Sequence, residues 1–169
     1  LNEGYIRDMA HPGDACSSQE EAVYEVRNDM LTLNSIIVRE LENVGLEVHT
    51  HPPHQWAMNL GPEFSGSLDL FSNSDPSLVH VTFGDVVDVE DDRKFGILSG
   101  DDLVARLALE LSDIESLIFA MGGVDGLLKV PPNKATDEDL IEHWSPDVSY
   151  EGLHQSDIDV TGGIGLKIT

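Results

Sequence analysis

Basic residues are scarce in this sequence of 169 residues, which has nine lysines and arginines against 32 aspartates and glutamates. Binding to a nucleic-acid backbone or to an anionic membrane surface depends on clusters of lysine and arginine. The formal net charge of −23 therefore disfavours nucleic acid and membrane surfaces as partners. The basic residues include four lysines: Lys94, Lys129, Lys134 and Lys167.

Cysteine and long apolar runs are also lacking. A single cysteine, Cys16, excludes an internal disulfide framework and a zinc site built from several thiolates. No apolar run approaches the roughly 20 residues that a membrane helix needs. No charged-then-apolar leader with a cleavage site is visible either, so nothing reads as a signal peptide. We therefore expect a cytoplasmic protein.

The acidic excess predicts how the surface responds to salt. Like charges on a folded chain repel one another, and at molar salt the Debye length shrinks to about 3 Å. With only four lysines, the sequence combines a deficit of lysine with its excess of acid. We interpret this as the surface of a halophilic protein, adapted to a salt-rich cytoplasm; an ordinary acidic protein is the alternative.

Apolar periodicity predicts alternating helices and strands. The helical pattern of 18–44 has apolar residues every three or four positions, and Gly45 can supply its left-handed stop. A continuous apolar run over 115–121 is typical of a strand inside a parallel sheet. Together these elements predict an α/β fold with a mainly parallel sheet. The other expected elements are strands at 46–50, 78–87 (one or two) and 95–98, a helix opening at Ser99, a short acidic helix over 136–143 and a helix entry at 159–163.

Two clusters have the composition of metal sites. His49 and His51 would share one face of an extended strand, with His54 close behind them. No carboxylate lies at ligand spacing nearby, so hydrogen-bonded or solvated imidazoles are the favoured interpretation and metal binding stays open. The acidic run 85–92 lacks the glycine and the closing glutamate of a calcium loop. We interpret that run as a solvated face, and we assign no metal ligand.

Three glycine-containing clusters lie at junctions between predicted elements, while the phosphate loop, dinucleotide fingerprint and nucleophile-elbow motifs are absent. Ser99-Gly100-Asp101-Asp102 opens a helix, where free backbone amides bind anions. The glycines of 122–126 follow the predicted strand that ends at Met121, at an edge where α/β sheets bind ligands. Thr161-Gly162-Gly163 sets Lys167 beside a third amide-rich turn.

The order of these clusters resembles isopentenyl phosphate kinase, a family of the amino acid kinase superfamily. The resemblance rests on Gly84-Asp85-Val86-Val87, on the segment 95–104, on Ile118-Phe119 leading to Val124-Asp125-Gly126, and on Asp159-Val160-Thr161-Gly162-Gly163 with Lys167. The helix 25–41, with Asn34 in its middle, is similar to the family's segment before the sheet. The similarity covers most of the chain from about Gln19 onward.

The resemblance implies an α/β three-layer sandwich and transfer of phosphate from ATP, with Mg²⁺, to a phosphate monoester, most specifically isopentenyl phosphate. By position, Ser99 and Gly100 would hold the substrate phosphate, and Asp101 would organise catalytic lysines. Asp125, Gly126, Gly163 and Lys167 would contact ATP, with Lys167 also catalytic. Asp102, the neighbour of Asp101, is expected to be a solvated first-turn acid. A homodimer is implied by the resemblance alone.

Departures from the family pattern leave other functions open. Gly122 and Gly123 replace the usual Thr-Asp, Leu128 stands where a tyrosine is common, and neither the lysine-glycine-glycine strand nor the glycine-rich loop of the family's amino-terminal part is visible. His11 before Pro12 is a candidate remnant of that loop. A sibling kinase for another phosphate, phosphonate or carboxylate, or a non-catalytic nucleotide-binding or assembly module, are the alternatives.

We expect a single partial amino acid kinase-like domain over 1–169. In it, 1–75 forms the acceptor side and 76–169 the nucleotide-binding side. We also expect the chain to comprise pieces of a longer protein, because it begins at Leu1 and ends one turn into a predicted helix.

Overall fold

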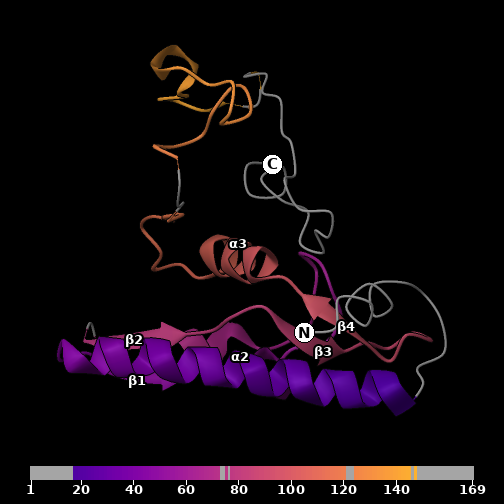
Figure 1. Cartoon of the computed structure of the whole chain (residues 1–169). Coiled ribbons are helices and arrows are strands. Elements are labelled where there is room, and N and C mark those ends of the chain that lie inside the picture. Colours follow the sequence, from indigo (N-terminus) through magenta and orange to yellow (C-terminus); the bar gives the residue numbers. More distant parts are fainter. Residues whose placement is uncertain (1–16, 73–74, 76, 121–123, 146, 148–169) are drawn as a thin grey trace. The chain divides into compact units, whose positions relative to one another are not determined.

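The structure is a computed structural model that describes residues 17–72, 75, 77–120, 124–145 and 147 (Figure 1). The chain divides into two units, Leu1–Glu115 and Ser116–Thr169, which are described separately. In the described part of both units, no helix has the length and apolar character needed to cross a bilayer. The expectation that 1–75 and 76–169 have separate roles remains a prediction.

Helix α2, Ser17–Asn43, confirms the longest predicted element, and Gly45 follows it with a φ of +88°. Its apolar stripe is buried only near its start, at Ala22 and Val23, whereas Leu33 further along is 52% exposed. Arg27 fixes the helix to the sheet. Its Nε donates to the carbonyl oxygen of Val86 at 2.8 Å, and its Nη2 donates to an Asp88 carboxylate oxygen at 2.9 Å.

Within the described residues, four short strands form two separate pairs. Strands β1 (Glu47–Thr50) and β2 (Leu78–Val81) are parallel, with His49 opposite His80. Strands β3 (Asp85–Asp88) and β4 (Phe95–Leu98) are antiparallel, with Asp85 opposite Leu98. Of the two strand pairs in the described residues, one is parallel, as the sequence predicts, and the other is antiparallel. The β3–β4 connection, 89–94, is far too short for the crossover that a parallel pair needs, so it forms a hairpin.

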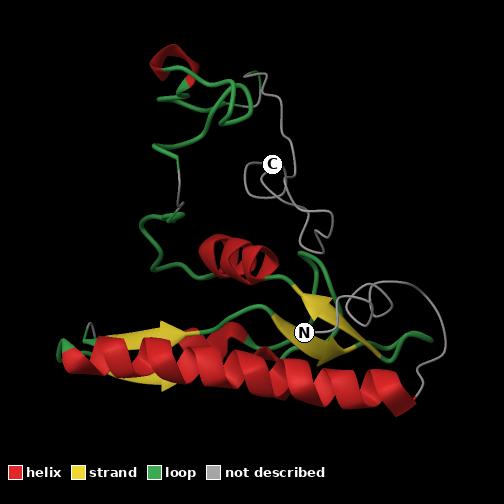
Figure 2. Cartoon of the chain, in the orientation of Figure 1, coloured by secondary structure: helices red, strands yellow, loops and turns green. Residues whose placement is uncertain are grey.

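The β3–β4 hairpin is the middle layer of a three-layer arrangement, which confirms the predicted sandwich for this unit (Figure 2). Because neighbouring residues on a strand point to opposite faces, Val86 and Val87 are both fully buried but in different cores. Val86 and Phe95 pack against α2 through Ala22 and Val23. Val87 and Leu98 pack with Leu103 and Leu107 of α3 (Gly100–Glu110) and with Leu111 just after it. The same core includes Ala57, Phe64 and Leu68 from the segment between β1 and β2.

The strand predicted over 115–121 is absent from its described part, residues 115–120. Ile118 is 84% exposed there. A parallel strand depends on hydrogen bonds to neighbouring strands and on cover over both faces, and no described strand pairs with this segment. In the second unit, the helix expected over 136–143 is shorter and of the 3-10 type, η3 (Asp137–Asp139), with Thr136 and Asp139 forming a capping box.

Candidate functional site

The start of α3 is built as the sequence predicts. Ser99 is the buried N-cap residue, and its Oγ accepts a hydrogen bond from the Asp101 amide at 3.1 Å. The capping bond uses the Ser99 oxygen as an acceptor, so the hydroxyl proton remains available to donate to an anion. The first-turn amides of an 11-residue helix, with Gly100 first among them, provide the positive end of the helix dipole.

A second glycine lies against this helix start. A Cβ on Gly84 would be 3.2 Å from the Gly100 amide nitrogen, and a Cβ on Gly100 would be 3.6 Å from the Gly84 nitrogen. Two backbones therefore approach each other directly where side chains would separate them. This contact joins the segment just before β3 to the α3 start, so residues around Asp85 are neighbours of the predicted phosphate site.

The two acids after Gly100 differ in their surroundings. Asp101 is half-buried, whereas Asp102 is buried beneath the first turn with Leu103. Desolvation by burial, and then the charge of Asp101, raise the pKa of the Asp102 carboxyl. The expectation that Asp102 is a solvated acid is therefore wrong. Asp102 and Leu103 are the two buried residues of α3, so the side of the first turn that bears Asp102 is covered as well as the side that bears Leu103.

The structure separates the three histidines that the sequence grouped. His51 Nε2 lies 2.8 Å from His80 Nδ1, with the two rings stacked, and the His49 ring is nearly perpendicular to the His80 ring at a centroid distance of 6.1 Å. His54 instead bonds to Asp85. Among the described residues, no three ligating side chains converge on a point where a metal ion could be held. His80, which the sequence analysis overlooked, is the centre of this imidazole cluster.

The His51–His80 pair predicts a loss of stability in mild acid. Burial and the neighbouring imidazoles lower the pKa of His51, and burial with His49 lowers that of His80. The unfolded chain, with histidines near pKa 6.5, then binds more protons than the folded chain below that pH. The free energy of unfolding should therefore fall as pH drops from about 6.5 towards the folded pKa values.

Urea unfolding between pH 7.5 and pH 5 tests this. His51→Gln should flatten the pH dependence, and the exposed His143→Gln should leave it unchanged. A His51→Gln profile parallel to that of the wild type would contradict the assignment.

Asp85 and His54 form a buried dyad beside the α3 start. The Asp85 side chain is 0% exposed, and its Oδ2 lies 2.6 Å from His54 Nδ1. Asp85 also accepts the backbone amides of His54 at 3.2 Å and of Val86 at 2.8 Å. The sequence analysis placed Asp85 in a solvated acidic run, and this is wrong for Asp85. It is a strand residue opposite the buried Leu98, whereas Asp88 and the acids of the turn are exposed.

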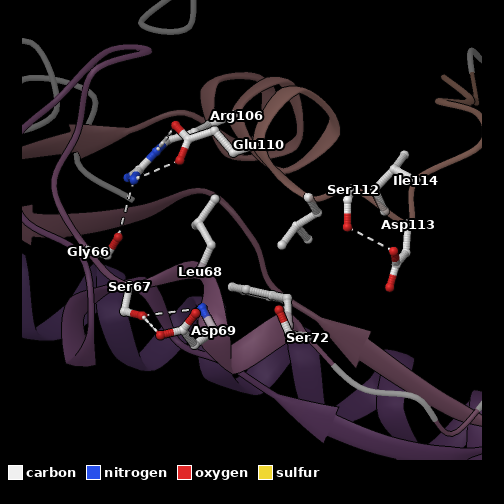
Figure 3. A pocket seen from close by; sticks show the side chains of 12 residues that line it. Gly66, Ser67, Leu68, Asp69, Ser72, Arg106, Glu110, Ser112, Asp113 and Ile114 are labelled. Atoms are coloured by element: carbon white, nitrogen blue, oxygen red, sulfur yellow. Dashed lines mark hydrogen bonds and ion pairs between the residues drawn. The ribbon is translucent and has the colours of Figure 1, made fainter.

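A pocket of about 550 Å³ in the first unit lies at the other end of α3 (Figure 3). Arg106 is its cation, but the guanidinium already donates to the carbonyl oxygens of Phe64 and Gly66 and to the Glu110 carboxylate. Asp69 and Asp113 add acid to the lining. A carboxyl-terminal helix end with acidic neighbours repels anions, so the α3 start rather than this pocket is the candidate phosphate site.

In the second unit, Asp125 lines a pocket of about 450 Å³ whose apolar wall includes Val124, Leu128 and Leu140. Gly126 lies beside this wall, since a Cβ there would be 3.0 Å from Leu140 Cδ1. Of the four predicted ATP-binding residues, Asp125 therefore lines this pocket and Gly126 lies beside it. The other two, Gly163 and Lys167, fall outside the described residues.

Comparison with known proteins bears on the family. No protein-family model matches the chain. The isopentenyl phosphate kinase of Thermoplasma acidophilum is 28% identical over 169 residues, 97% of this chain and 64% of that protein. The isopentenyl phosphate kinase of Methanocaldococcus jannaschii is 29% identical over 156 residues, 89% of this chain and 56% of that protein. The chain is therefore similar in sequence to isopentenyl phosphate kinases over most of its length.

Solved structures show which fold this chain shares. An X-ray structure of isopentenyl phosphate kinase matches with a TM-score of 0.65 and 23% identity over 80% of this chain and 57% of that one. A substrate complex of isopentenyl phosphate kinase matches with a TM-score of 0.50 and 24% identity over 62% of this chain and 44% of that one. The α/β amino acid kinase fold is thereby confirmed. The chain spans about three-fifths of the length of the curated relatives that it matches.

Proposed function

We propose that the protein is an ATP-dependent phosphotransferase that phosphorylates a phosphate monoester, with isopentenyl phosphate as the acceptor and isopentenyl diphosphate as the product. The observation that carries the proposal is the α3 start, where the capped helix beginning Ser99-Gly100 offers its first-turn amides beside Gly84. Two relatives named isopentenyl phosphate kinase support the choice of acceptor.

Phosphoryl transfer between two phosphates requires little covalent participation by protein side chains. An oxygen of the acceptor phosphate attacks the γ-phosphorus of ATP, a new P–O–P bond forms, and the bond to the leaving ADP breaks. The attacking phosphate is already ionised near neutral pH, so no general base is needed. Catalysis then consists of in-line positioning and of cations on the transferred group. We assign the acceptor phosphate to Ser99 and Gly100, and one such cation to Lys167, which Asp101 would hold in place.

We assign ATP to the pocket that Asp125 lines, with Gly126, Gly163 and Lys167 as further contacts. The apolar wall of that pocket suits the flat face of a base, and a carboxylate suits ribose hydroxyls. Mg²⁺ would accompany ATP, held by its phosphate oxygens, by water and by one or two carboxylates. A homodimer in the cytoplasm completes the proposal.

Rates of ATP-dependent phosphorylation across an acceptor panel test the proposal. We expect isopentenyl phosphate to give the highest kcat/KM, above an alkyl phosphonate and a carboxylate of similar length. A preference for the phosphonate or the carboxylate would favour a sibling kinase. ATP binding without transfer to any of the three would favour a non-catalytic module.

A halophilic surface predicts that stability rises with salt. Exposed acids on α2, on the 88–92 turn and on η3 face solvent with few lysines to balance them. Screening at molar salt removes much of their repulsion from the folded state. Thermal unfolding in KCl from dilute to molar concentration should therefore show a rising Tm. A Tm that stays flat or falls across that range would mark an ordinary acidic surface.

A further inference from the structure

In the His54–Asp85 dyad, Asp85 orients the His54 imidazole through its Nδ1 atom, and the Nε2 atom takes no part in this contact. An ionised carboxylate can only accept hydrogen bonds, so the 2.6 Å contact requires a proton on His54 Nδ1. The amide of His54 bonds to the same Asp85 oxygen at 3.2 Å, which fixes the ring relative to its own backbone. Within the described part of the chain, His54 Nε2 has no hydrogen-bond partner, and the side chain keeps 17% of its surface exposed.

The elements around the dyad bring it to the helix start that we assign to the acceptor phosphate. His54 belongs to the short helix η1, Pro53–Gln55, which packs on β3. Asp85 pairs with Leu98, the residue just before the Ser99 cap. Gly84, next to Asp85, lies directly against Gly100. No residue with a side chain separates the backbone beside the dyad from the backbone that opens α3.

We propose that His54, oriented by Asp85, binds the acceptor phosphate through Nε2, together with the amides at the α3 start. Asp85 is a positioning residue, since it acts on the phosphate only through the ring. A protonated imidazole donates from Nε2, and a hydrogen bond from a cation to a phosphate is stronger than one between neutral groups. The inference rests on the proposed function for the location of the phosphate.

A structural clamp is the competing explanation, because the dyad also ties η1 to β3. Two substitutions separate these roles. In His54→Asn, the amide nitrogen can take the place of Nδ1 and keep the bond to Asp85, but nothing replaces Nε2. In His49→Asn, an exposed imidazole on neighbouring β1 is removed, which makes this variant the matched control.

The dissociation constant for isopentenyl phosphate, measured calorimetrically without ATP, is the main readout. We expect His54→Asn to weaken binding about ten- to hundredfold, as for the loss of one hydrogen bond to a charged group. Its Tm should stay close to that of the wild type, and His49→Asn should bind like the wild type. Binding by His54→Asn within twofold of the wild type would overturn the inference.

A second measurement needs no variant. The Nδ1 proton of His54, in a short bond to a buried carboxylate, should be recognisable by NMR from its downfield position. Titration of the wild-type protein with inorganic phosphate should move the resonances of that ring. Failure of this ring to respond, while the α3 amides do respond, would also overturn the inference.

Transfer from ATP is assayed separately, so the two proposals fail in different ways. Kinase activity with unchanged binding in His54→Asn would remove only the role of His54. Phosphate bound through His54 without any transfer would remove only the proposed function.

Discussion

Replacing Asp101 with asparagine is expected to lower the kcat of phosphoryl transfer about a hundredfold. A carboxylate between two phosphates is repulsive unless it holds cations in place, so its removal should misplace Lys167 rather than merely weaken substrate binding. Loss of one transition-state cation costs on the order of 3 kcal/mol, which corresponds to that factor. Lys167→Ala should show a similar loss. The double variant should lose much less than the sum, because the two residues act as a unit.

The control for this prediction is set by the structure. Asp102 cannot serve, because it is buried and its pKa is raised by desolvation and by Asp101. Glu20 is an exposed acid in the first turn of α2, and Glu20→Gln should leave kcat unchanged. A kcat of Asp101→Asn within threefold of the wild type would contradict the assignment. If ATP still bound to that variant, Asp101 would be a structural residue of the helix start.

Truncating Leu98 to alanine should lower the free energy of unfolding of the first unit by about 3 kcal/mol. Leu98 is fully buried in the core between the hairpin and α3, and it also supports Asp85 across the strand pair. The lost leucine leaves a cavity that the surrounding layers cannot close. Because a domain is stable by only about 5–15 kcal/mol, this loss would be a large part of the total.

Urea unfolding followed by Trp56 fluorescence measures this change, since Trp56 packs against the same core. A Trp144→Phe background removes the signal of the second unit. Leu109→Ala is the matched control on α3, because Leu109 is 86% exposed and its loss should cost less than about 0.5 kcal/mol. Equal effects of the two truncations would show that the hairpin core does not limit stability.

Local signals in the sequence were sufficient for the main elements of the first unit. The apolar spacing of α2, the stop at Gly45 and the Ser99 cap depend on neighbouring residues only, and all three are found in the structure. The pairing of strands depends on residues distant in the sequence. For that reason the periodicity did not reveal that β3 and β4 form an antiparallel hairpin, or that 115–120 lacks a strand partner.

The candidate site shows the same division. The helix start at Ser99 and Gly100 follows from capping preferences and was predictable. The dyad was not, because Asp85 and His54 are 31 positions apart and each belongs to a stretch whose composition indicates solvent exposure. The usable signal was position: Asp85 directly precedes Val86 and Val87 in the apolar strand, whereas the exposed acids from Asp88 onward lie at or beyond its end.

The most direct test of the central claim is a ³¹P NMR spectrum of the protein incubated with ATP, Mg²⁺ and isopentenyl phosphate. The account predicts that the singlet of the monophosphate is replaced by the two coupled doublets of a diphosphate, in step with the appearance of ADP. Unchanged isopentenyl phosphate, with ATP either intact or hydrolysed to ADP and inorganic phosphate, would contradict it.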